Sequence, residues 1–244
     1  MLQKSLYHLG RMAAGLYVKT RLEADVVWHA PLPKGAKIIA PNHPTTADPI
    51  WLTGLIPEQM HFIITHSLGQ VPVVNRYLTQ TGHLILNPSE GRSTFDRAVQ
   101  CLREGKTMAI FPEDDLSPLD NTLNRARTGV VRMALMMGAP IIPVGISIRP
   151  ECIKFQSHDF GDHKKTARWY LNGPYAVTVG APIYLEGSAN DRERVVVLST
   201  ELLENILSLS WEGLCRLEKF LPGKRIVVSS PGQTTQDRMF RIPQ

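Results

Sequence analysis

Residues 37–48 read KIIAPNHPTTAD, and this stretch decides how the fold begins. Lys37–Ala40 is a short apolar run of the kind that enters a buried strand. The polar segment that follows contains Pro44, which favours a turn, and Pro49 comes directly after Asp48, as at the first position of a helix. The stretch therefore predicts a strand, a turn that carries polar side chains, and a helix that opens at Asp48.

The same alternation of β-like and helical runs continues along the chain. Further strands are predicted at Met60–Thr65, His83–Asn87, Thr107–Phe111, Ile141–Ile148 and Tyr175–Val179. Helices are predicted from Ser93, with Asp96 completing a cap, to Gly105; from Thr128 to Met137; and from Asn190 to about Leu217. This order predicts an α/β fold, with a central and mostly parallel sheet flanked by helices.

The first residues predict an amphipathic helix. Apolar side chains recur there at helical spacing, at Leu2, Leu6, Leu9, Ala13 and Leu16. Such a helix can lie among lipid headgroups or pack on the core of its own domain, and both readings stay open. We therefore divide the chain into an N-terminal basic amphipathic segment (1–36), an α/β domain (37–221) and a C-terminal tail (222–244).

Composition narrows the class of protein. The 244 residues are 43% apolar and 20% charged, as in an ordinary globular domain, and no run reads as a transmembrane span or a secretory signal. Three widely spaced cysteines disfavour a disulfide framework or a zinc site, and they fit a reducing compartment. We expect a cytoplasmic protein.

The net charge of +5 gathers towards the two ends of the chain. This pattern favours contact with an anionic surface, although simple solubility explains it equally well. We expect membrane lipids as the partner and no nucleic acid, because basic and aromatic residues are not interleaved as in nucleic-acid sites.

His43 and Asp48 are the leading candidates for chemistry. An imidazole is well matched to removing a hydroxyl proton near neutral pH, and it works better when a carboxylate holds its other nitrogen. The turn at Pro44 would bring Asp48 back beside the ring. A structural histidine at a turn is the plainer alternative for such a short spacing.

The segment Asn42–Asp48 resembles the N-H-x-[S/T]-x-x-D signature of the glycerolipid acyltransferases, which include the lysophosphatidate and glycerol-3-phosphate acyltransferases. Three further blocks resemble that family in the expected order. They are Gly82–Pro88, Phe111-Pro112-Glu113, and Ile142–Ile146. Together the four blocks cover about residues 38–148.

The resemblance implies an acyltransferase fold in which His43 and Asp48 are catalytic. Acyl-CoA or acyl carrier protein would be the co-substrate, a lipid hydroxyl would be the acceptor, and neither a metal nor a bound cofactor would be required. Residues of the matching blocks and two nearby arginines would contact substrate. They are Asn42, Thr45, Thr46, Leu86, Asn87, Pro112, Glu113, Asp114, Asp115, Arg92 and Arg127.

Two departures from the family concern the acceptor. The second block ends in Asn87-Pro88, where the family has an acidic residue and an arginine. In the third block, Asp114-Asp115-Leu116 follows Glu113 where the family has Gly-Thr-Arg, so that arginine is also missing. An acidic pair would repel a phosphate. Arg92, Arg125 and Arg127 are possible replacements, and a non-phosphorylated acceptor is the alternative. A catalytically inactive lipid-binding protein also stays open.

Overall fold

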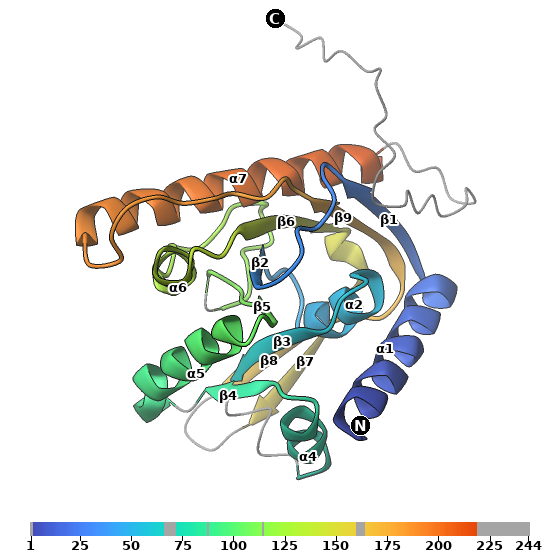
Figure 1. Cartoon of the computed structure of the whole chain (residues 1–244). Coiled ribbons are helices and arrows are strands. Elements are labelled where there is room, and N and C mark those ends of the chain that lie inside the picture. The colour runs from blue at the N-terminus through green and yellow to red at the C-terminus, as the bar shows by residue number, and fades with distance from the viewer. Residues whose placement is uncertain (1, 66–71, 87, 114, 160–163, 219–244) are drawn as a thin grey trace, which may run out of the picture.

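The computed structural model describes residues 2–65, 72–86, 88–113, 115–159 and 164–218 (Figure 1). Its central sheet has the strand order β1-β9-β6-β2-β5-β3-β4, and β7 and β8 form a separate hairpin. The strands are β1 (Leu22–Trp28), β2 (Lys37–Pro41), β3 (Met60–Thr65), β4 (Leu84–Leu86), β5 (Thr107–Ala109), β6 (Ile141–Ile148), β7 (Ile153–Asp159), β8 (Lys164–Tyr170) and β9 (Gly173–Val179).

The central sheet is mostly parallel, as predicted. The pairs β1–β9, β2–β6, β2–β5, β3–β5 and β3–β4 are parallel, and β6–β9 is antiparallel. All six predicted strands are present, although β4 and β5 are shorter than expected. Parallel neighbours leave the sheet at the same edge, so the loops after β2 and β5 start side by side.

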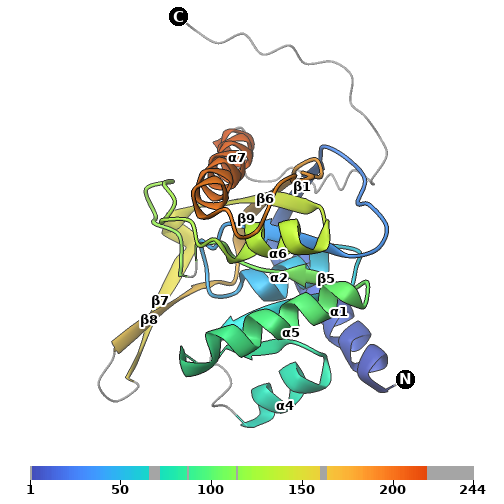
Figure 2. The ribbon, with the colours of Figure 1, turned by 60° about the vertical axis from the view of Figure 1, so that its left-hand side comes forward.

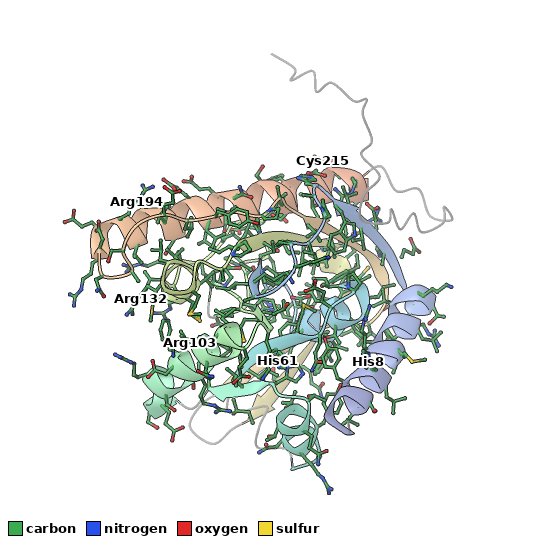
Figure 3. All side chains as sticks on the ribbon, in the orientation of Figure 1. His8, His61, Arg103, Arg132, Arg194 and Cys215 are labelled. Carbon is green, nitrogen blue, oxygen red and sulfur yellow. The ribbon has the colours of Figure 1, made fainter. Side chains whose placement is uncertain are left out.

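Helices cover both faces of this sheet. They are α1 (Leu2–Arg21), α2 (Asp48–Leu55), α4 (Pro72–Gln80), α5 (Gly91–Arg103), α6 (Gly129–Met137) and α7 (Arg192–Glu218). Successive strand residues point to opposite faces, so Ile38 packs with α5, α6 and α7 while Ile39 packs with α1 and α2. Figure 3 shows side chains filling these two layers, with Arg194 and Cys215 towards the two ends of α7.

Two predicted helices are confirmed and one start is corrected. Helix α6 ends where Gly138 takes a left-handed conformation (φ 59°), and α7 buries its predicted apolar stripe. Helix α5 begins at Gly91 rather than at Ser93, with no side-chain cap. Ser93 therefore lies inside the first turn and cannot act as the N-cap, and Asp96 pairs with Arg92 one turn away.

Three strands were missed. Strand β1 follows α1 directly and pairs with β9, so residues 22–28 of the predicted N-terminal segment belong to the sheet. Strands β7 and β8 lie in a polar stretch that lacks apolar alternation, and their hairpin extends away from the body of the domain (Figure 2). The division of the chain at residues 36 and 221 stays a prediction, and the predicted tail lies outside the described residues.

Helix α1 presents two different faces. Tyr7, Ala14 and Val18 are buried, and the Tyr17 ring stacks on Trp51 of α2 with 4.8 Å between ring centroids. The side chains of Leu9, Met12 and Leu16 are exposed; we call these three residues the outer face of α1. The packing of α1 on the core of its own domain is therefore confirmed for one face, and contact of the outer face with lipid headgroups stays a prediction. Among the described residues, no helix is long and apolar enough to cross a membrane.

Candidate active site

The site forms where β2 and β5 end. Lys37 of β2 pairs with Thr107 of β5, so the loop that carries His43 and the loop that carries Glu113 leave the sheet together. The parallel neighbour β6 closes the other side of β2. Active sites of such sheets gather at this edge, because loops of neighbouring strands meet there.

His43 and Asp48 form the predicted pair. The His43 Nδ1 atom lies 3.0 Å from Oδ2 of Asp48. The carboxylate only accepts hydrogen bonds, so it favours the tautomer in which Nδ1 carries the proton and Nε2 carries a lone pair. The Asp48 side chain is fully buried, whereas 18% of the His43 side chain is exposed. The buried carboxylate of Asp48 therefore holds the His43 ring on one side, and part of the ring stays accessible from solvent.

Asp48 is surrounded by hydrogen-bond donors. The Thr45 N–H and hydroxyl donate to its two oxygens over 2.8 and 2.6 Å. The hydroxyl of Tyr175, on β9, donates to Oδ1 over 2.9 Å. With His43, four donors replace the water that a buried carboxylate loses, which is what an ionised Asp48 needs in this position.

Glu113 lies beneath the His43 loop. Its Oε1 accepts a short hydrogen bond from the Ser117 hydroxyl and a longer one of 3.4 Å from the His43 N–H, while Oε2 accepts one from the Asn124 N–H over 2.8 Å. Burial raises the pKa of Glu113, and these hydrogen bonds oppose that rise. The carboxyl group therefore ties the two loops together.

Neighbouring strands hold the same loop from its other side. The Asn42 amide exchanges two hydrogen bonds with the backbone of Ile146 on β6, at 2.9 and 2.6 Å. Thr46 and Arg168 of β8 are linked by two more, at 2.9 and 3.0 Å. The Arg168 guanidinium also donates to the Ser117 carbonyl. These contacts fix the backbone on both sides of His43.

A largely apolar cavity of about 280 Å³ opens beside His43. The His43 ring stacks on Phe111, with 3.9 Å between ring centroids. The other lining residues are Thr46, Pro49, Ile63, Ile64, Leu86, Gly91, Thr94, Phe95, Ile110, Pro112, Arg127, Gly129, Val130 and Met133. The cavity thus joins an acid–base pair to a space suited to a hydrocarbon chain.

Residues 23–147, which are 125 of the 244 residues, match the Acyltransferase family. The chain belongs to this family. The match includes His43, Asp48 and Glu113, and it ends at Ser147 in β6.

Two curated proteins are similar to part of this chain. A 1-acyl-sn-glycerol-3-phosphate acyltransferase from Borreliella burgdorferi is 31% identical over 120 residues, which cover 46% of this chain and 45% of the relative. One of the same name from Helicobacter pylori is 25% identical over 162 residues, covering 62% and 65%. The chain thus spans about half to two thirds of the length of these relatives.

The fold is that of a solved acyltransferase. The structure resembles the crystal structure of the 1-acyl-sn-glycerophosphate acyltransferase PlsC from Thermotoga maritima, with a TM-score of 0.58 and 21% identity. The match covers 84% of this chain and 78% of PlsC. This likeness confirms the predicted acyltransferase fold.

The predicted substrate-binding residues of the acyltransferase separate into three groups. Those that line the cavity are Thr46, Leu86, Pro112 and Arg127. Those whose side chains bond within the loops or to β6 are Asn42, Thr45 and Glu113. Arg92 is exposed and paired with Asp96, Asp115 is exposed, and Asn87 and Asp114 lie outside the described residues. Their roles in binding stay predictions.

Sequence reasoning missed three residues that hold the site. Ser117 donates to Glu113 and accepts a hydrogen bond of 2.8 Å from the His43 N–H. Arg168 and Tyr175 reach the site from β8 and β9. Nothing in the motifs indicates these two, because they come from strands far along the chain.

In the described part of the chain, no group of three or more His, Cys, Asp or Glu side chains is arranged to hold a metal ion.

Proposed function

We propose that this protein transfers a fatty acyl group from a thioester to a lipid hydroxyl, with 1-acylglycerol-3-phosphate as the acceptor. The observation that carries the proposal is the His43–Asp48 pair, 3.0 Å apart, at the wall of an apolar cavity. Family membership supports acyl transfer as the reaction, and the names of the two curated relatives support this acceptor.

The reaction follows from the tautomer that Asp48 favours. Nε2 of His43 accepts the proton of the acceptor hydroxyl as its oxygen attacks the thioester carbonyl. The tetrahedral intermediate then collapses, its carbon–sulfur bond breaks, and the departing thiolate takes the proton from the imidazolium. Asp48 stabilises that imidazolium between the two steps. No acyl-enzyme and no resident cofactor take part in this sequence.

The acyl chain of the donor fits the cavity beside His43. Its walls carry aliphatic and aromatic side chains, and burying a chain there gains about 0.8 kcal/mol per methylene group. Arg127 lines the same cavity, so its guanidinium is the described cation best placed to meet an acceptor phosphate there. The donor is acyl-CoA or acyl carrier protein.

The test is thiol release by the purified full chain. Acyl-CoA and acyl carrier protein are each offered with 1-acylglycerol-3-phosphate and with 1-acylglycerol, and lipid products are identified by mass spectrometry. Release that requires 1-acylglycerol-3-phosphate and yields diacylglycerol phosphate supports the proposal. No acceptor-dependent release from either donor contradicts it.

A second acceptor class follows from the acidic residues after Glu113. Asp115 is exposed beside the catalytic loop, where it would repel a phosphate dianion, and family arginines are absent from the matching positions. A non-phosphorylated hydroxyl, such as that of a neutral lipid or glycolipid, avoids this repulsion. In the same assay, faster turnover with 1-acylglycerol favours this class.

We also propose that the enzyme binds the inner surface of the cytoplasmic membrane through α1. The outer face of α1 exposes 65% of Leu9, 72% of Met12 and 64% of Leu16. Lys19 and Arg21 follow in the last turn, where they can meet anionic headgroups. An apolar face with basic residues nearby is typical of helices that lie in a bilayer interface.

Replacing Leu9, Met12 and Leu16 together with glutamine is expected to weaken binding to anionic phospholipid vesicles by at least about tenfold. Each side chain contributes on the order of 1 kcal/mol when it leaves water. Vesicle co-sedimentation measures the change, and glutamine at Val196 and Val197, which are exposed on α7, is the matched control. Equal vesicle binding by the triple variant and wild type would contradict the proposed surface.

A further inference from the structure

Tyr175 links a distant strand to the catalytic carboxylate. Its hydroxyl donates to Oδ1 of Asp48 over 2.9 Å, and both side chains are fully buried. The other partners of Asp48 are His43 and Thr45, which belong to its own loop. Tyr175 lies 127 residues away, in the middle of β9. It is therefore the contact that fixes the carboxylate relative to the sheet.

The two oxygens of Asp48 have different partners. Oδ2 faces His43 and the Thr45 N–H, while Oδ1 accepts from the Thr45 hydroxyl and from Tyr175. A carboxylate held through both oxygens cannot rotate without breaking a hydrogen bond. Together with the two hydrogen bonds from Thr45, the Tyr175 bond therefore keeps Oδ2 aimed at the imidazole.

The phenol remains a donor at working pH. Burial and the nearby negative charge of Asp48 raise the pKa of Tyr175 well above its ordinary value. The titratable groups that face the His43–Asp48 pair are Tyr175, which donates to Asp48, and Glu113, which accepts a hydrogen bond from the His43 N–H; Tyr170 packs beside Tyr175 at 6.0 Å between ring centroids. A neutral phenol that donates to a buried carboxylate stabilises its charged form.

We propose that Tyr175 is a positioning residue that acts through Asp48, holding the carboxylate aimed at His43 during acyl transfer. This inference rests on the proposed function. Tyr175 is fully buried and is not among the residues that line the cavity, so we expect it to affect the rate of the chemical step rather than substrate binding.

The variant Tyr175→Phe tests this role, because it removes one hydroxyl and keeps the ring. We expect kcat to fall about tenfold, as for loss of a hydrogen bond to a charged group, with KM unchanged. We also expect the acid limb of the plot of kcat against pH to move to higher pH. With one donor fewer, Asp48 either takes a proton more readily or attracts the imidazolium more strongly, and both effects move the limb upwards.

Tyr170→Phe is the matched control. Tyr170 is equally buried, and its hydroxyl donates to the Pro174 carbonyl over 2.6 Å rather than to the site. The Tyr170→Phe variant should lose thermal stability as Tyr175→Phe does, but the acid limb of its kcat–pH profile should stay in the wild-type position. An unchanged acid limb in Tyr175→Phe, or the same shift in Tyr170→Phe, overturns the inference.

Two further measurements keep the inference testable whatever the stability of Tyr175→Phe. In the Asp48→Asn background, Tyr175→Phe should cost little further activity, and an undiminished tenfold loss there overturns the proposed route through Asp48. Replacing Tyr175 by 3-fluorotyrosine, a stronger donor of similar size, should move the acid limb to lower pH. A shift to higher pH overturns the inference.

The outcomes also separate this inference from the proposed function. If the His43→Ala variant keeps its turnover, both the proposed function and the positioning role of Tyr175 are contradicted. Turnover that is lost in His43→Ala and normal in Tyr175→Phe contradicts the positioning role of Tyr175 alone.

Discussion

Replacing His43 with alanine is expected to lower kcat by about 10²–10⁴-fold, the range for removal of a general base. His43 is the titratable side chain that lines the cavity with a ring nitrogen free of Asp48, and no described histidine besides it is among the lining residues. Without it, the acceptor hydroxyl must lose its proton to water. Acceptor-dependent thiol release at saturating substrate measures the change.

The fold should survive this change, since part of the His43 side chain is exposed and Asp48 keeps three of its four donors. A melting curve checks that point. The control is His8→Ala, because His8 is an exposed histidine on α1, away from the cavity (Figure 3). Turnover of His43→Ala within threefold of wild type would remove His43 from the mechanism.

Replacing Asp48 with asparagine is expected to lower kcat by a similar factor for a different reason. The amide can donate a hydrogen bond to Nδ1, which leaves the proton on Nε2 and removes the lone pair that accepts the hydroxyl proton. Combining His43→Ala with Asp48→Asn should cost scarcely more than either change alone, because the two residues act as one unit.

Asp48→Asn should also destabilise the fold, unlike His43→Ala. With its nitrogen towards His43, the asparagine amide cannot accept the hydrogen bond that the Thr45 N–H gives to Oδ2, so this buried donor is left unpaired at a cost of about 1–3 kcal/mol. Urea unfolding measures the loss. Asp96→Asn, on the exposed surface of α5, is the control. An Asp48→Asn enzyme with normal turnover would show that the carboxylate does not set the tautomer.

The sequence predicts the catalytic pair because its members are close along the chain. Five positions and one turn separate His43 from Asp48, so local geometry brings them together. The approach of Glu113 to His43 also follows from sequence, since both come after strands of one parallel sheet. The short apolar strands and the end of the helix at Met137, just before Gly138, are equally local signals, and they too are confirmed.

What the sequence does not indicate depends on pairing between distant segments. Tyr175 meets Asp48 only because β9 joins β6 antiparallel, and Arg168 meets Thr46 only because β8 passes beside the loop. The hairpin itself was missed because its exposed strands are polar, so no alternation marks a buried face. The predicted cap at Ser93 is wrong because the helix begins two residues earlier, at Gly91, which places Ser93 inside its first turn.

The tautomer of His43 in the wild-type protein tests the central claim most directly. Nitrogen NMR of protein labelled with ¹⁵N-histidine distinguishes the two ring nitrogens, and comparison with His43→Ala assigns the signals. We predict a neutral ring with the proton on Nδ1, hydrogen-bonded to Asp48, and a bare Nε2 that can accept a proton from an alcohol. A neutral ring protonated on Nε2 would contradict the account.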